Sequence, residues 1–223
     1  MKSIYYVFFL SCLFISATQG QASFNLDTVK KHMIYVKAGI QPNLSYRIGY
    51  QQNFTWLNPK SNFTLYTELQ GSFIRKIDKN INGRIGIILP ARLGSKWYVF
   101  NDFFAATGHL ETTHFSSNRF VLGDKIDFGL YKQRWSINLT VSYHWILASE
   151  IVHTQFYRDT FFSEAQDGWY KGAGGFFLVG LESNWLIAHK FDVGFAILYP
   201  FSQAGNSLGG APANATVEIG WRF

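Results

Sequence analysis

The chain has 223 residues, of which 18% are aromatic and 15% are charged, and its formal net charge at pH 7 is +6. Beyond the first 20 residues, no apolar run is long enough to cross a membrane as a helix. No basic aromatic platform accompanies the positive charge, so nucleic acid is excluded as an expected partner.

The first 20 residues have the three parts of a secretory signal peptide. Lys2 supplies the positive charge, residues 4 to 15 form an almost wholly apolar stretch, and residues 17 to 22 form a cleavage zone of small residues. Cleavage is expected after Gly20. The mature chain, residues 21 to 223, is expected to be one domain, and it has lost the only cysteine, so strand pairing and packing must stabilise it.

Ten later segments show the alternation of apolar and polar side chains that is typical of β-strands. In chain order they are residues 33 to 41, 44 to 54, 63 to 74, 83 to 91, 96 to 106, 121 to 132, 135 to 146, 174 to 185, 191 to 200 and 214 to 223. The segment 135 to 146 shows it most clearly, because Ile137 and Leu139 share one face while Asn138 and Thr140 share the other.

One face of such strands can contact lipid and the other a polar lumen. A sheet in lipid must also close on itself, because its backbone groups have to pair internally. The sequence therefore predicts an all-β fold, a transmembrane antiparallel up-and-down β-barrel. Ten strands are expected, with eight or twelve as the alternatives.

The connections between these segments alternate between short and long. The short ones, 57 to 62, 92 to 95, 132 to 134 and 186 to 190, are expected at the periplasmic end, and the long ones, including 108 to 119, 147 to 173 and 201 to 213, at the outer surface. The alternation predicts that the N- and C-termini are both periplasmic. The role of the longest loop, 147 to 173, stays open.

The last segment ends in Trp221-Arg222-Phe223, with Val217, Ile219, Trp221 and Phe223 on one face. This pattern resembles the closing strand of bacterial outer-membrane β-barrel proteins of the porin-like and OmpA-like class. The resemblance implies a multi-pass protein of the Gram-negative cell envelope, with Trp221 and Phe223 as part of the assembly signal. It also implies two partners, outer-membrane lipid and the barrel assembly machinery during insertion. Lipopolysaccharide is expected as a further partner, because its phosphates suit outward cations such as Arg75, Lys76 and Lys79.

Strand parity places a set of charged side chains inside the barrel. These are Lys37, Arg47, Glu68, Arg84, Asp127, Glu182, Asp192, Glu218 and Arg222, and Asp102 is also assigned to the inside. The two signs are nearly balanced, which favours a paired network that fills a narrow lumen. A gated polar pathway is the alternative.

No nucleotide-binding loop, zinc-ligand spacing or nucleophile elbow occurs in the chain, so no cofactor and no metal ion is expected. Some membrane barrels are enzymes, however, and the candidate catalytic residues are His144, His153, Ser142 and Asp159. Ser142 and His144 lie on one face of a strand about 7 Å apart, too far for a direct hydrogen bond unless a bulge intervenes. A polar histidine in the lumen is the favoured interpretation.

The sequence thus predicts an integral outer-membrane barrel with a closed or narrow polar lumen, acting in envelope structure, surface interaction or limited solute passage. One alternative is an outer-membrane enzyme, modifying lipid A or phospholipid or cleaving peptides, with a histidine-containing site at the extracellular rim. Another is an accessory subunit of an envelope machine, bound to an unknown envelope protein. Wide diffusion is not expected, since aqueous channels belong to barrels of about 16 to 18 strands.

Overall fold

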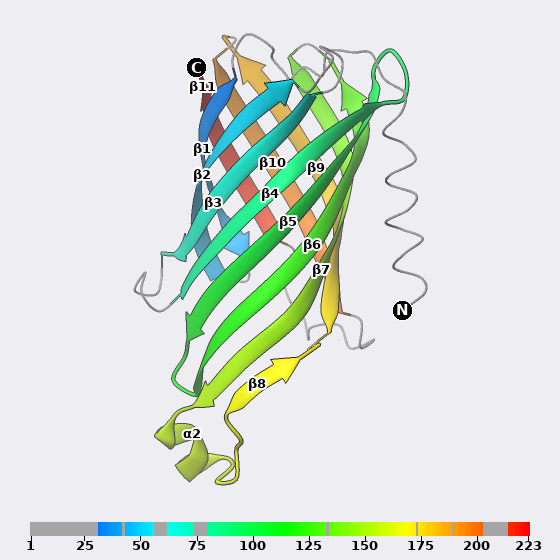
Figure 1. Cartoon of the computed structure of the whole chain (residues 1–223). Coiled ribbons are helices and arrows are strands. Elements are labelled where there is room, and N and C mark those ends of the chain that lie inside the picture. The colour runs from blue at the N-terminus through cyan, green and yellow to red at the C-terminus, as the bar shows by residue number, and fades with distance from the viewer. Residues whose placement is uncertain are drawn as a thin grey trace.

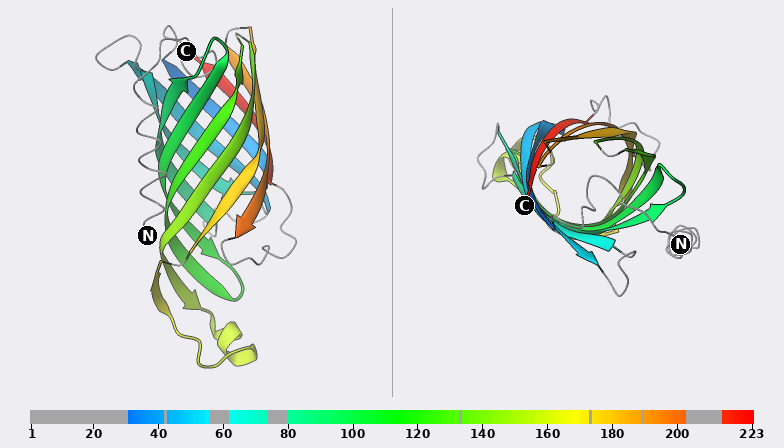
Figure 2. Two further views of the ribbon diagram at one scale, coloured as in Figure 1. Left: turned by 90° about the vertical axis from the view of Figure 1, so that its right-hand side faces the viewer. Right: turned by 90° about the horizontal axis from the view of Figure 1, so that it is seen from above.

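The computed structural model describes residues 31–41, 43–55, 62–73, 80–132, 134–172, 174–188, 190–202 and 214–223. The signal peptide expected at residues 1 to 20 lies outside this part of the chain. Within it, no helix has the length and apolar character needed to cross a membrane. The described strands wrap around one axis, as the view from above shows (Figure 2).

Ten strands form the barrel, and an eleventh short strand is added outside it. The barrel strands are β1 (His32–Gln41), β2 (Asn43–Thr55), β3 (Asn62–Ser72), β4 (Asn80–Arg92), β5 (Trp97–Glu111), β6 (Phe115–Tyr131), β7 (Trp135–His153), β9 (Gly175–Ile187), β10 (Phe191–Ser202) and β11 (Asn214–Arg222). The short strand is β8 (Gly168–Lys171), which follows helix α2 (Gln155–Thr160). Figure 1 shows α2 and β8 beyond one end of the barrel.

The barrel closes between its first and last strands. β1 pairs antiparallel with β11 from Met33 opposite Arg222 to Ile40 opposite Ala215, and every other neighbouring pair is also antiparallel. The chain ends are joined as well, because Phe223 N–H donates to His32 O at 3.0 Å. The prediction of a closed, ten-stranded antiparallel barrel is therefore confirmed, and no lateral strand edge is left between β1 and β11.

The outer surface is apolar and the interior polar, the reverse of a water-soluble protein. On β7, Ile137 and Leu139 are 47% and 49% exposed, whereas Ser136 and Thr140 are fully buried. The other strands repeat this arrangement, with Trp97, Trp185 and Trp221 among the exposed outer side chains. An exposed apolar surface of this extent marks a lipid-contacting face.

Two predicted loops are wrong in part. Residues 108 to 119 do not form a loop, since β5 and β6 continue to Glu111 and Phe115 and only three residues turn between them. The loop 147 to 173 contains the end of β7, α2 and β8. Beyond the lipid layer strands need no apolar outer face, so these polar segments lose the alternation yet still pair. A register shift between Phe120 and Val121 marks where this part of the sheet begins. We call it the extension: it consists of the ends of β5 and β7 and the start of β6 beyond this shift, together with α2 and β8.

Candidate functional site in the lumen

Inward side chains surround a cavity of about 180 Å³ in the lumen. Among the residues assigned to the interior from the sequence, those that line it are Lys37, Arg47, Glu68, Arg84, Asp102, Asp127, Glu182, Asp192 and Glu218. Lys125 also lines it and was missing from the predicted set, although it has the same parity as Asp127 and could have been found from it. With Lys125 added, the inward side chains carry five positive and six negative charges, so the interior is nearly neutral.

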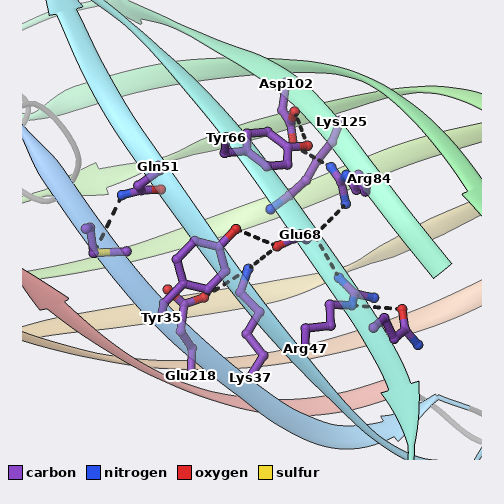
Figure 3. A network of polar contacts seen from close by, with 12 residues as sticks. Tyr35, Lys37, Arg47, Gln51, Tyr66, Glu68, Arg84, Asp102, Lys125 and Glu218 are labelled. Carbon is purple, nitrogen blue, oxygen red and sulfur yellow. Dashed lines mark hydrogen bonds and ion pairs between the residues drawn. The ribbon is translucent and has the colours of Figure 1, made fainter. Parts of the chain in front are cut away.

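Glu68 on β3 is the centre of the larger charge cluster, and its side chain is only 4% exposed. Tyr35 donates its hydroxyl to Glu68 Oε1 at 2.8 Å, and Lys37 Nζ lies 3.3 Å from the same oxygen. The guanidinium groups of Arg47 and Arg84 lie 3.6 and 4.0 Å from Oε2. One carboxylate therefore compensates three cations that come from three different strands (Figure 3).

The cluster extends in both directions around the barrel wall. Lys37 Nζ also contacts Glu218 Oε2 on β11 at 3.0 Å. On the other side, Arg84 donates to Asp102 Oδ2 at 2.6 Å, and its guanidinium lies 3.6 Å from the centroid of the Phe104 ring. The network thus runs from β11 through β1, β3 and β4 to β5.

Two tyrosine hydroxyls complete the cluster, and glycines make room for their rings. Tyr66 donates to Asp102 Oδ1 at 2.8 Å, as Tyr35 does to Glu68. A Cβ on Gly49 would lie 2.2 Å from the Tyr35 ring, and one on Gly86 would lie 2.5 Å from the Tyr66 hydroxyl. The absence of a side chain therefore lets each ring lie across the neighbouring strand, where its hydroxyl can reach the acid.

A second cluster bridges strands that are not neighbours. Lys125 Nζ on β6 lies 2.8 Å from Glu182 Oε2 on β9, with β7 between them, and 3.1 Å from Asp127 Oδ2. Thr140 on β7 donates to Asp127 Oδ1 at 2.6 Å. This arrangement draws β6, β7 and β9 together across the lumen side of the wall.

Arg222 and Asp192 form a separate pair beside the chain terminus. Arg222 Nη2 donates to Asp192 Oδ1 at 2.9 Å, and Arg222 Nε donates to Asp192 Oδ2. The two side chains are 3% and 6% exposed. These two hydrogen bonds join the end of β11 to the start of β10 on the lumen side of the wall. Trp221 and Phe223 lie on the opposite, outer side.

The structure corrects the expected separation of Ser142 and His144. Ser142 Oγ and His144 Nε2 lie 3.0 Å apart, because the two side chains lean toward each other along the strand. The His144 ring stacks on Phe176 with centroids 4.6 Å apart and meets Phe104 edge-on. No carboxylate of the described residues is hydrogen-bonded to this histidine, so the pair lacks the third group that orients a catalytic base.

The four candidate catalytic residues of the enzyme alternative do not form one site. His153 is nine residues beyond His144 on β7, about 30 Å at the rise of a strand. Asp159 lies in α2 and accepts a hydrogen bond from Gln155 at 2.8 Å. His153 instead contacts Asp167, its ring Nδ1 lying 3.0 Å from Oδ1. Among the described residues, no group of three histidine, cysteine or acidic side chains is placed to hold a metal ion.

Hydrogen bonds to Asp167 connect the segment that contains α2 to the end of β7. Asp167 accepts hydrogen bonds from the backbone N–H of His153 at 2.8 Å, from the His153 ring and from Arg158. These donors, led by the backbone N–H, lower the pKa of its carboxyl from 3.8 to about 2. Because the pKa is lower in the folded state, the ionised carboxylate stabilises the folded segment. This stabilisation is complete above about pH 4 and is lost as the pH falls toward 2.

We therefore predict that Asp167→Asn increases amide hydrogen exchange in residues 154 to 168 at neutral pH, while the barrel strands are unaffected. In the unchanged protein the protection of this segment should persist at pH 4 and fall near pH 2. Hydrogen-exchange mass spectrometry in detergent, corrected for intrinsic rates, measures both. Asp159→Asn is the control, because its contact with Gln155 lies within α2. Equal exchange in the Asp167 variant and the unchanged protein would contradict the prediction.

The closed barrel, its apolar exterior and its charged interior define the class: this is a transmembrane antiparallel β-barrel. No protein-family model and no curated protein matches the sequence. Among solved structures, the chain is similar to the KdgM porin in complex with disordered oligogalacturonate, with 10% sequence identity and a TM-score of 0.42 over 86% of this chain and 99% of that one. It is also similar to the KdgM porin by itself, with 10% identity and a TM-score of 0.39 over 86% and 98%.

Proposed function

We propose that the protein keeps a narrow, charge-compensated lumen that admits water and small solutes and blocks larger ones. The observation that carries the proposal is the bridging of the interior by ion pairs, with Lys37 held between Glu68 and Glu218 and Lys125 between Asp127 and Glu182. Charges taken into a narrow lumen are stable only when they are paired, so opening the passage requires breaking several contacts together. The network acts as a constriction.

Planar-bilayer recording of the refolded protein tests this proposal. The unchanged protein should show small or no conductance, since the ten-stranded wall is far from the size of a wide diffusion pore. The double variant Lys125→Ala, Glu182→Ala removes a bridge with both of its charges, and it should conduct more. Asn118→Ala, on the outer face of the extension, is the control. A large, steady conductance of the unchanged protein would contradict a constricted lumen.

We also propose that the extension is extracellular and that both chain ends are periplasmic. Two features support this orientation. His32 and Phe223 meet at one end, where the connections Leu93–Lys96 and 132–134 are short, and α2 and β8 lie at the opposite end (Figure 1). Long extracellular loops and short periplasmic turns are the rule in this class of barrel.

The orientation is testable with a single cysteine introduced at Phe162, which is 57% exposed beyond α2. The Phe162→Cys variant should react with a membrane-impermeant maleimide on intact cells. A Lys96→Cys variant, in a short turn at the other end, should react only after the outer membrane is permeabilised. The reverse labelling pattern would show that the barrel is inserted the other way round.

A further inference from the structure

The outward face of the extension carries aromatic and polar side chains that take no part in the network of the lumen. They come from four neighbouring strands, and we name the set the outer platform: His109, Asn118, Phe120, Glu150, Trp169 and Lys171. In the register, Asn118 is opposite both His109 and Glu150, Glu150 is opposite Trp169, and Phe120 and Lys171 are both opposite Ala148. Directly opposed residues share one face of a sheet, so all six point the same way.

Two aromatic rings of the outer platform lie nearly parallel and open to the surroundings. The centroids of Phe120 and Trp169 are 6.0 Å apart, with an angle of 21° between the ring planes. Phe120 is 47% exposed and Trp169 is 53% exposed. Between their strands lies the small Ala148, so no bulky side chain on β7 separates the two rings.

A row of hydrogen-bonded polar groups borders these rings. His109 Nδ1 and Asn118 Oδ1 lie 2.7 Å apart, and Asn118 Nδ2 donates to Glu150 Oε2 at 2.7 Å. The contacts hold three planar polar groups in fixed orientations on rigid strands, and they remain exposed to solvent. Preformed polar groups beside flat apolar rings lower the entropic cost of binding a ligand that has both characters.

The outer platform continues the lipid-contacting wall beyond the rim of the barrel. Phe120 has the same parity on β6 as Leu122 and Phe128, which are exposed on the lipid side. Trp145, opposite Leu122, is paired with Gly175, where β9 begins, and so lies at the rim. The row of Ala148 is three residues further along β7, about 10 Å at the rise of a strand. The platform therefore faces the layer next to the hydrocarbon and not the lumen.

We propose that the outer platform binds the saccharide part of lipopolysaccharide in the outer leaflet. The flat rings of Phe120 and Trp169 suit the apolar face of a sugar ring, because aromatic side chains favour sites that are apolar on one side and wet on the other. The amide and carboxylate of the polar row suit sugar hydroxyls, and Lys171 supplies a cation for a phosphate group. The inference rests on the proposed extracellular position of the extension and is independent of conduction through the lumen.

Native mass spectrometry of the folded full-length protein in detergent, titrated with purified rough lipopolysaccharide, tests the proposal. The unchanged protein should retain lipopolysaccharide that has a core oligosaccharide better than lipid A alone. Phe120→Ala and Trp169→Ala should each weaken binding of the core-bearing form about tenfold while leaving lipid A binding unchanged. Phe120→Ala carries the test if the loss of Trp169 detaches β8, because Phe120 lies on the long strand β6.

Phe162→Ala is the matched control, since this aromatic is also exposed, at 57%, but lies outside the outer platform. It should bind as the unchanged protein does, and all variants should keep the heat-dependent gel migration of a folded barrel. Equal binding of core-bearing lipopolysaccharide by both platform variants and the unchanged protein would overturn the proposal, as would an equal loss in the Phe162 variant. A reversed cysteine-labelling pattern would instead refute the orientation on which it rests, and an increased conductance would bear only on the lumen.

Discussion

Replacing Glu68 by glutamine is expected to destabilise the folded barrel by about 3 to 5 kcal/mol, the usual effect of removing one partner from a buried ion pair. Glu68 is 4% exposed, and three cations lie within 4.0 Å of its carboxylate oxygens. Glutamine keeps the shape and can still accept the Tyr35 hydrogen bond, so the loss reports the charge. The midpoint of unfolding in urea, with lipid vesicles present, measures the effect.

Glu218→Gln is the matched control for this variant. Glu218 is 20% exposed and is paired with Lys37, so its loss should lower the midpoint less. The Glu68 variant should also favour anions over cations in any residual conductance, because Lys37, Arg47 and Arg84 then face the cavity without their central acid. An unchanged unfolding midpoint would show that the three cations are compensated by other groups.

Replacing Phe223 by alanine is expected to reduce the amount of protein in the outer membrane severely, while the finished barrel loses no more than about 1 to 2 kcal/mol. The ring is 46% exposed and packs against Trp221 and His32, at centroid distances of 5.1 and 5.6 Å. A ring exposed to this extent contributes little to folded stability. The terminal pattern, however, resembles the assembly signal of outer-membrane barrels, which predicts poor insertion and degradation in the periplasm.

The measurement compares the level of the variant in outer-membrane fractions with its unfolding midpoint after refolding in detergent. Phe191→Ala is the matched control, because Phe191 is also 46% exposed and lies opposite Trp221 on β10, at the same end of the barrel. The control should lose a similar amount of folded stability and reach the membrane normally. Normal membrane levels of the Phe223 variant, together with a much lower midpoint, would make Phe223 a packing residue only.

The sequence by itself determined the class of fold. Successive side chains of a strand point to opposite faces, so a strand with one lipid face and one polar face has alternating apolar and polar residues. The segment 135 to 146 shows this alternation without reference to any other part of the chain. The same parity assigned Lys37, Glu68 and Arg84 to the interior, because a charge on the lipid face is costly. Closure followed from the need of every backbone group in lipid for a partner.

Only the tertiary structure decided which charges meet. Lys125 joins Glu182 across β7, and Tyr35 reaches Glu68 across β2, because curvature brings together side chains whose distance in sequence carries no signal. Parity also could not predict that Ser142 and His144 lean into contact, since this depends on side-chain torsion angles. The extension of β5, β6 and β7 was missed for a related reason. Outside the lipid layer the outer face of a strand does not have to be apolar, so the sequence need not alternate there. Pairing with the neighbouring strands then determines where these strands end.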